Sequence, residues 1–463
     1  MVDIRSLELT SLSKGELITI IYEFAGEIEL LKTRIIDLEE KISKKGGSDN
    51  QKKILPLWVK SNVKNKKSKK RKKRTHAFVR MKDTPTATVF HSHEVCPDCA
   101  GILGVPAVSY RRQIIDIPIT SATVTEHVIF KRYCFSCKTR SYPTPNLSSF
   151  VIGKYRIGIN LMGLISTMRS EMRLPIETIQ HHLSIFYHLK LSVGEIVKIL
   201  HVVAGFGKPD YQKIKLQLLR SPVIHADETG GRENGKNGYF WNFSNERFQF
   251  LLYRKSRGSK VVKEVLGVDG EDYEGVIVSD FYAAYNEYQG FHQRCLVHYL
   301  RDMKTLIEEY PGDKILKRWA KDIRLLFEKA KQYTGPPDNL PIGLKEQLRE
   351  KKEAYFKMQL TNICEPYLGK QTVFSKLNAR ALKYISELFT FVRFPNIKSD
   401  NNTAERALRH LVVSRKISGG TRSAKGSETK SILASLFGTW KLQNLNPFEQ
   451  TRNLLLQASS SRT

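Results

Sequence analysis

Three acidic residues of this chain could together perform metal-dependent chemistry. Asp227 lies in VIHADETG, Asp280 in VIVSDFYAAY and Glu405 in SDNNTAERALRH. Each aspartate closes a short apolar run typical of a strand, and the glutamate lies on a predicted helix far downstream. Carboxylates brought together from two strand ends and a helix can hold two Mg²⁺ ions about 4 Å apart, which activate an attacking oxygen and stabilise a leaving oxygen on phosphorus.

Each carboxylate also has a simpler explanation. A lone aspartate at a strand end often caps a turn, and Glu405 with Asn402 forms an Asn-x-x-Glu capping box, a routine helix start. Because side chains alternate along a strand, Asp227 and Glu228 cannot both face the same metals if the strand continues that far, whereas His225 shares a face with Asp227. We favour Asp227 and keep Glu228 as its rival.

The segments around these residues predict one α/β domain. The expected strands are PVIHAD, YFWNFSN, FQFLLYR and GVIVSD, with the helix SKVVKEVL before the last of these and a fifth element in HQRCLVHYL. Residues 230–238 are expected to form a turn-rich connection. Three antiparallel strands, a helix and a further strand match the ribonuclease H-like order, which places acids at the ends of the first and fourth strands and on a later helix.

Composition indicates a polyanionic partner. The chain has 463 residues, with 76 Lys+Arg against 46 Asp+Glu and a formal net charge of +30. Nucleic acid is the commonest partner of so basic a chain. An anionic membrane could also attract it, but no lipidation motif or long apolar segment supports that reading. The opening residues MVDIRSLELT lack the pattern of a signal peptide, so we expect a cytoplasmic protein.

Four of the six cysteines form two CxxC pairs. Cys96 with Cys99 and Cys134 with Cys137 are separated by 34 residues that contain strand-like runs. Two thiolate pairs on tight turns supply the four tetrahedral ligands of a structural Zn²⁺, as in a zinc ribbon. His91 and His93, just upstream, are either spare ligands or solvent-exposed side chains.

The N-terminal region predicts a coiled coil and a basic linker. Apolar residues alternate at spacings of four and three from Leu17 to Ile42, nearly four heptads, which fits either a coiled coil between chains or an amphipathic helix packed on its own protein. The basic linker is expected to be disordered alone and to hold DNA by counterion release, unless it is only a solubilising segment. The linker residues proposed to contact DNA are Lys66, Lys67, Lys69, Lys70, Arg71, Lys72, Lys73 and Arg74.

Residues 153–220 are predicted to be helical. Two apolar helices flank a turn at residues 190–192, and Ser192 with Glu195 forms a capping box. The pair could be a helix-turn-helix that contacts DNA or an ordinary helical hairpin.

Taken in order, HADETG, NGKNGYFW, VSDFYAAY, CLVH, DNNTAERALR, SRKISGG and SLFGTW resemble the insertion sequence 66 family of transposases, over roughly residues 15–450. The resemblance implies a DDE transposase in which Asp227, Asp280 and Glu405 are the catalytic triad. It also implies a helical insertion near residues 302–396. Cys295 and His298 match a recurring Cys-x-x-His pair, which either braces the fold, holds a metal or is simply a buried Cys beside a local His.

The sequence departs from that family at several points. Ala100 follows Cys99 where many relatives have glycine, and Leu296 and Val297 replace an aromatic residue in the late Cys-x-x-His motif. The Ser/Pro-rich stretch expected after the coiled coil is reduced to GGSDNQKKILP. None of these changes removes a catalytic carboxylate.

The expected architecture is multidomain α/β. A ribonuclease H-like catalytic domain with a helical insertion follows a coiled coil, a zinc-ribbon-like module and a helical domain. The expected boundaries are 1–45 for the coiled coil, 46–85 for the basic linker, 86–145 for the zinc module, 146–220 for the helical DNA-binding domain, 221–301 with 397–450 for the catalytic domain, 302–396 for the insertion and 451–463 for the C-terminal tail.

The expected function is cleavage of transposon ends and joining of the freed 3′-hydroxyls to target DNA. Catalytic Mg²⁺ or Mn²⁺ and structural Zn²⁺ are the expected cofactors. Partners would be DNA, a second copy of the chain in a dimer or larger oligomer, and accessory proteins of the element, in a bacterial or archaeal nucleoid. A domesticated, non-catalytic DNA-binding regulator and a metal-dependent nuclease without strand transfer are the alternatives. Near the glutamate, the side chains expected to contact DNA are Arg406, Arg409, Arg415 and Lys416.

Overall fold

The computed structural model describes residue 28 and residues 84–117, 120–267 and 273–460. Two units separate at residues 115 and 116, and each is treated by itself. The predicted coiled coil, apart from Ile28, and the predicted basic linker lie outside the described residues. Of the first unit the structure describes residues 84–115, whose one regular feature is a bridge between Val95 and Ile102 around the first cysteine pair.

The second unit begins with a short hairpin and three helices. Strands β1 (Arg132–Cys134) and β2 (Thr139–Ser141) pair in antiparallel fashion. Helices α2 (Ile159–Ser170), α3 (Ile176–Tyr187) and α4 (Val193–Leu219) follow. The predicted capping box is confirmed, since Ser192 Oγ accepts the Glu195 N–H and the Glu195 carboxylate accepts the Ser192 N–H.

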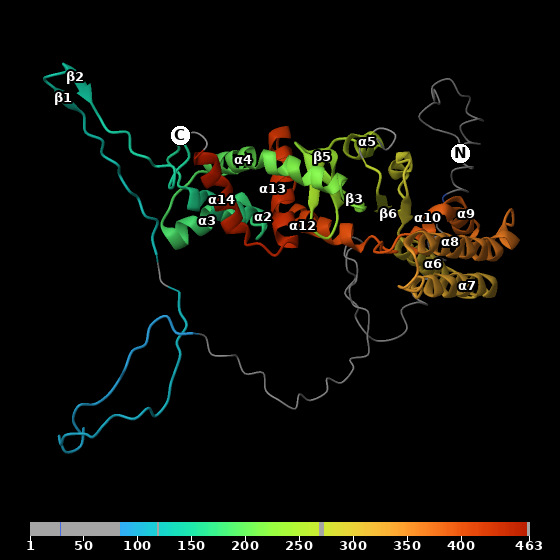
Figure 1. The fold of residues 1–463 in the computed structure, drawn as a ribbon, viewed down its shortest axis with the longest axis horizontal. Helices are drawn as coiled ribbons and strands as arrows, with labels where there is room; N and C mark the ends of the chain where they lie inside the picture. The colour runs from blue at the N-terminus through green and yellow to red at the C-terminus, as the bar shows by residue number, and fades with distance from the viewer. Residues whose placement is uncertain (1–27, 29–83, 118–119, 268–272, 461–463) are drawn as a thin grey trace. The chain divides into compact units, whose positions relative to one another are not determined.

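A five-stranded mixed sheet forms the centre of this unit (Figure 1). Its strands are β3 (Val223–Glu233), β4 (Lys236–Ser244), β5 (Gln249–Arg254), β6 (Val276–Ser279) and β7 (His292–Arg294), in the order β5-β4-β3-β6-β7. The first three pair in antiparallel fashion, and β6 and β7 run parallel to β3. Helix α5 (Lys260–Leu266) and the 3₁₀ turn η3 (Ala283–Glu287) flank β6. The mixed α/β prediction is confirmed.

The predicted turn-rich connection at residues 230–238 is wrong in its extent. The antiparallel pairing of β3 with β4 continues to the pair Glu233 and Lys236, so only Asn234 and Gly235 form the turn. Both have positive φ, 48° and 75°, as a two-residue hairpin loop of this kind requires. Asp227 therefore lies within β3 and not at its end, because a hairpin with a twist-matched Asn-Gly turn extends the pairing through the neighbouring glycines.

Three later helices are α12 (Asn402–Ser418), α13 (Ala424–Leu442) and α14 (Pro447–Ser460). The first two contact the sheet, whereas α14 packs on α2, α4 and α13. Helix α12 packs on β3 and β4, and α13 lies between α4 and the edge strand β5. The hydroxyl of Ser435 accepts the N–H of Leu251, and that of Thr439 accepts the N–H of Gln249. These bonds satisfy an edge that would otherwise be open to pairing with another chain.

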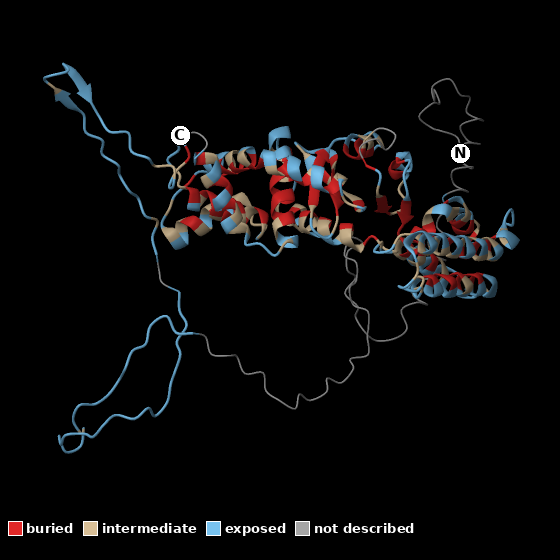
Figure 2. Ribbon diagram, in the orientation of Figure 1, coloured by how far each residue is buried: buried red, intermediate tan, exposed pale blue. Residues whose placement is uncertain are grey.

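The two faces of the sheet carry different kinds of side chain. One face carries Trp241 and Phe243, which join the large core with α4, α5 and α13. Figure 2 marks the buried residues of the ribbon in red. The other carries His225, Asp227 and Asn242 and lies under α12, where the apolar contacts are fewer. Polar side chains thus concentrate beneath α12.

A separate helical group follows β7. It contains α6 (Leu296–Glu309), α7 (Lys314–Lys331), α8 (Ile342–Cys364), η4 (Glu365–Tyr367), α9 (Ser375–Lys383), α10 (Ile385–Leu388) and α11 (Thr390–Arg393). Its members build their own apolar core, in which Trp319 stacks on Phe374 and Phe356 stacks on Phe389. Residues 302–396, predicted to form a helical insertion, are largely helical in the structure. Within the described parts of the chain, no helix is both long and apolar enough to cross a membrane.

Candidate active site

The sheet register places Asp227 and Asp280 side by side. His225 of β3 pairs with Val278 of the parallel strand β6, and each aspartate lies two residues beyond its member of that pair. Adjacent strands are about 4.8 Å apart, and residues two apart share a face. Both carboxylates therefore project from neighbouring strands at the same level of the sheet.

The charge of Glu405 acts on Asp227, together with the charges of two other carboxylates. Burial is the main cause that raises the pKa of Asp227 to about 8. The negative charges of Glu228, Asp280 and Glu405 act in the same direction. A carboxyl group beside other carboxylates in a poorly hydrated place resists ionisation, and a bound cation would remove that penalty.

Glu228 has partners that Asp227 lacks. It accepts hydrogen bonds from Tyr285 Oη at 2.5 Å and from Arg257 Nη2 at 2.7 Å, and its side chain is only 2% exposed. Because β3 continues through both residues, Glu228 projects to the face opposite Asp227. The arrangement gives Glu228 a bracing contact between β3, η3 and the Arg257 loop.

Asn401 holds the start of α12 against β3. Its Nδ2 donates to the Ala226 carbonyl at 2.7 Å, and its Oδ1 lies 3.1 Å from His225 Nδ1. Since a carbonyl can only accept, the amide orientation is set, and His225 must donate from Nδ1. Burial lowers the pKa of His225 to about 4, in keeping with a neutral ring.

The predicted capping box at Asn402 and Glu405 is wrong. The N-cap is Asn401, whose side chain is engaged with β3, while the Asn402 N–H is accepted by the carboxylate of Asp400 at 3.0 Å. Glu405 lies in the first turn of α12 with Oε1 buried and without a hydrogen-bond partner in the described structure. The glutamate carboxylate is thus left available for another role.

Cys295 and His298 both contact residues at the start of α12. The Cys295 thiol is fully buried and accepts the Asn401 N–H at 3.2 Å. His298 Nε2 lies 3.6 Å from Glu405 Oε1. Cys295 therefore braces the start of α12, and His298 faces the glutamate.

The donor set fits a divalent cation by its chemistry. All three groups are carboxylates, the ligands that Mg²⁺ prefers, and in the described structure a buried Glu405 oxygen accepts no hydrogen bond and has only His298 nearby, at 3.6 Å. Within residues 84–117, 120–267 and 273–460, no three His, Cys, Asp or Glu groups form a ready ligand cluster.

The basic residues predicted to contact DNA have different surroundings. Arg406 and Arg409 are exposed on α12, and Lys416 is exposed in its last turn. Arg415 instead turns to β3 and donates to the Gly230 carbonyl. The linker cations, residues 66–74, lie outside the described residues.

Each cysteine pair occupies a tight turn suited to thiolates. The Asp98 N–H is the main cause that lowers the pKa of Cys96, and the Cys137 N–H, 3.5 Å from Cys134 Sγ, is the main cause for Cys134. The residue after each second cysteine, Ala100 or Lys138, has positive φ, 57° and 53°. Because glycine adopts that conformation most easily, Ala100 is a strained choice in the first turn. The two pairs fall in different units, so each is described alone.

Two parts of the amino-acid sequence match the models of a known protein family. The transposase IS66 family matches residues 154–429, which include all three carboxylates and more than half of the chain. The zinc-finger binding domain of transposase IS66 matches residues 93–138, which include all four paired cysteines.

The chain belongs to the IS66 family of transposases.

This membership confirms the resemblance seen in the sequence and implies a DNA-processing enzyme that binds DNA. The zinc-finger match supports zinc as the metal of the cysteine module. No curated protein matches the sequence.

Sequence reasoning missed several residues of the transposase site. Asn401 was overlooked beside Asn402, although the doubled Asn before Ala and Glu was visible. The partners of Glu228, Tyr285 and Arg257, had no distinguishing signal in the sequence. Asn242, fully buried opposite Asp227 with an unpartnered Oδ1 among the described residues, was also missed.

Proposed function

We propose that this transposase cuts the phosphodiester at each end of its element and joins the freed 3′-hydroxyl to target DNA, with Asp227, Asp280 and Glu405 as the catalytic carboxylates. The observation that carries the proposal is geometric: the register of β3 with β6 brings Asp227 and Asp280 to one level, and Asn401 ties the start of the Glu405 helix to β3. A strand order of β5-β4-β3-β6-β7 with a helical group after β7 supports a ribonuclease H-like catalytic domain.

Two Mg²⁺ or Mn²⁺ ions held by these carboxylates would supply an activated oxygen nucleophile and neutralise charge on the leaving oxygen. The residues of the chain fix where that can happen. Strands β3 and β6 hold Asp227 and Asp280 at the same level of the sheet. Asn401 fixes the start of the helix that carries Glu405 against β3. Cys295 and His225 hold Asn401 in turn.

The remaining parts complete the proposal. Cys96, Cys99, Cys134 and Cys137 bind one structural Zn²⁺. The zinc module and helices α2–α4 grip the element ends, the heptad segment joins two or more subunits, and accessory proteins of the element assist. The predicted domain boundaries stand as part of this proposal, as does action at the nucleoid of a bacterial or archaeal cell.

The experiment uses the full-length protein, labelled DNA carrying the element's own ends, and Mg²⁺ or Mn²⁺. Wild type should produce 3′-end nicks and joined products, whereas Asp227→Asn should bind DNA and produce neither. Nicking without joining would support the nuclease alternative. Tight binding without cleavage by either protein would support the regulator alternative.

A further inference from the structure

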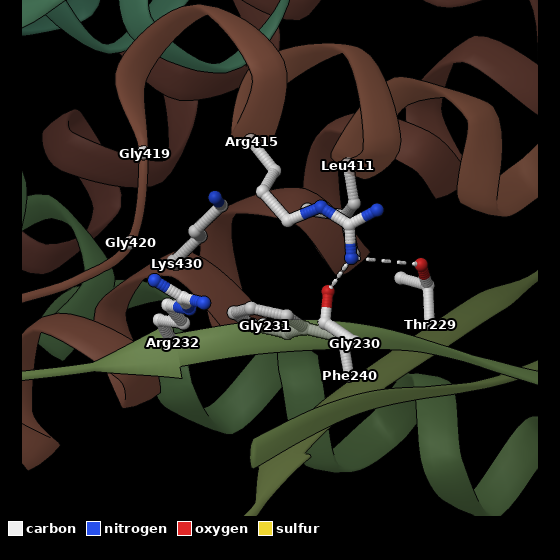
Figure 3. Close-up of a pocket in the computed structure, with 10 residues that line it drawn as sticks. All are labelled: Thr229, Gly230, Gly231, Arg232, Phe240, Leu411, Arg415, Gly419, Gly420 and Lys430. Atoms are coloured by element: carbon white, nitrogen blue, oxygen red, sulfur yellow. Dashed lines mark hydrogen bonds between the residues drawn. The ribbon is translucent and has the colours of Figure 1, made fainter. Parts of the chain in front are cut away.

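A small pocket lies where the far end of β3 meets the ends of α12 and α13. Arg232 comes from β3, Arg415 from the last turn of α12 and Lys430 from α13, and Figure 3 shows the three side chains around the same space. The turn Gly419–Gly420 closes one side. We call this the basic pocket.

The turn is fitted closely to the strand. The Thr421 N–H donates to the Arg232 carbonyl at 2.8 Å, and the Asn234 N–H donates to the Thr421 carbonyl at 2.8 Å. A Cβ at Gly420 would collide with the Arg232 carbonyl. The basic pocket is therefore a built feature, in which the backbone of the turn extends the edge of β3.

The cations of this pocket lack a counter-charge. Within the described ranges, no carboxylate forms an ion pair with Arg415, Lys430 or the nearby Arg169. The Lys430 amine lies 5.3 Å from the centroid of the Phe240 ring. Burial, followed by the charges of Arg169 and Arg415, lowers the pKa of Lys430 to about 8. Positive groups gathered away from water without an anion are costly, which indicates that an anion completes the site.

The pocket also lies in line with the catalytic carboxylates. Glu405 lies in the first turn of α12 and Arg415 in its last turn, and β3 passes from Asp227 to Gly231 beneath the helix. Asp227 and Gly231 are four strand residues apart, about 13 Å, equivalent to roughly four base steps of a DNA strand. Both positions are on the same face of β3.

We propose that the basic pocket binds one phosphate of the DNA backbone, a few nucleotides from the phosphate that is cut, through Lys430, Arg415 and the Gly419–Gly420 turn. The inference rests on the proposed function. The pocket favours a long polyanion over a free ion, because Arg232 at the pocket is itself exposed and the adjoining segments carry three more exposed cations. These are Lys416, which follows Arg415, and Arg422 and Lys425, which follow the Gly419–Gly420 turn.

The test replaces Lys430 by glutamine, which keeps a polar side chain only one atom shorter and removes the charge. Lys430→Gln should bind end DNA roughly 5–10-fold more weakly and reduce the slope of log affinity against log salt by about 1. Its melting temperature without DNA should rise, because an uncompensated charge has been removed. Lys441→Gln is the matched control on the same helix, since Lys441 is exposed and pairs with Glu171 at 2.7 Å. The control should leave DNA affinity and slope unchanged.

Inorganic phosphate tests the pocket without DNA. Phosphate should raise the melting temperature of wild type more than that of Lys430→Gln. A phosphate effect on wild type with unchanged DNA binding by Lys430→Gln would identify a free-phosphate site and overturn the proposal. A fall in melting temperature with unchanged DNA binding would show a structural lysine and overturn it as well.

Asp227→Asn separates this inference from the proposed function. If wild type and Asp227→Asn bind end DNA equally and Lys430→Gln binds as they do, only the basic-pocket proposal fails. If wild type itself binds no DNA, the proposed function fails and takes this inference with it.

Discussion

The side-chain amide of Asn401 donates to the backbone carbonyl of Ala226 at 2.7 Å, and this bond joins the glutamate helix to the aspartate strand. Ala226 precedes Asp227, and Asn401 is the N-cap of the helix that carries Glu405. The buried side chain of Asn401 therefore links the strand that carries Asp227 to the helix that carries Glu405.

Asn401→Ala should lower the free energy of unfolding by about 1–3 kcal/mol, because it leaves the Ala226 carbonyl and the His225 ring buried without their partner. It should also weaken Mn²⁺ binding, since Glu405 loses its support. Asn402→Ala, one residue on, should change stability by less than about 0.5 kcal/mol. Denaturant unfolding and Mn²⁺ titration check both variants, and equal effects at the two positions would contradict the assignment.

Asp227→Asn should stabilise the metal-free protein, and more so at higher pH. The folded-state pKa of Asp227 is raised to about 8, whereas an unfolded aspartate titrates near about 4. The folded state therefore holds this proton more tightly, and the resulting stability is fully present below about pH 4 and is lost as the pH rises through about 8. At pH 8.5 the asparagine variant should exceed wild type by on the order of 1–3 kcal/mol. Asp338→Asn, at an exposed position, should show no such trend in melting temperature between pH 6 and 9.

Mn²⁺ binding should release a proton near neutral pH, because the same carboxyl group must ionise to bind a cation. With a pKa of about 8, the loss of one proton should raise the affinity roughly 25-fold between pH 6 and pH 7.5. Calorimetric titrations in two buffers of different ionisation enthalpy measure the proton directly. No proton release from wild type would show that Asp227 is not a ligand.

Glu228→Gln should retain strand cleavage at a level at least about tenfold above that of Asp227→Asn, because glutamine can still accept the Tyr285 hydroxyl. Burial raises the pKa of Glu228, so a neutral replacement is tolerated. Glu228→Ala should instead cost about 1–3 kcal/mol of stability, since Tyr285 and Arg257 lose their acceptor. Complete loss of cleavage by a stable Glu228→Gln protein would move the catalytic role to that residue.

Ala100→Gly should tighten zinc binding by the cysteine module, by about 1 kcal/mol, because it removes the strain of a positive φ next to Cys99. Ala107 is exposed and has no positive φ, so Ala107→Gly serves as the control. Competition with a chromogenic chelator measures the affinity. Cys96→Ser should release the zinc entirely if each pair supplies two of the four ligands.

Much of the fold followed from local pattern. The segments YFWNFSN and FQFLLYR predict two strands, and the structure has β4 and β5 there. The strand hairpin was misjudged because its glycines resemble a loop in sequence. Their small size instead permits packing, as at Gly231, where a Cβ would collide with Phe240.

Residue types and spacing by themselves determined the chemistry available to this chain: three carboxylates, two thiolate pairs and a large excess of cations. Only the tertiary structure decided which groups meet. The parallel pairing of β3 with β6 brings Asp227 level with Asp280, and long-range hydrogen bonds of Asn401 place Glu405 beside them. Lys430 also lies near Arg415 only because α12 and α13 pack at the same end of β3. These segments are distant in sequence, so no local pattern predicts the contact.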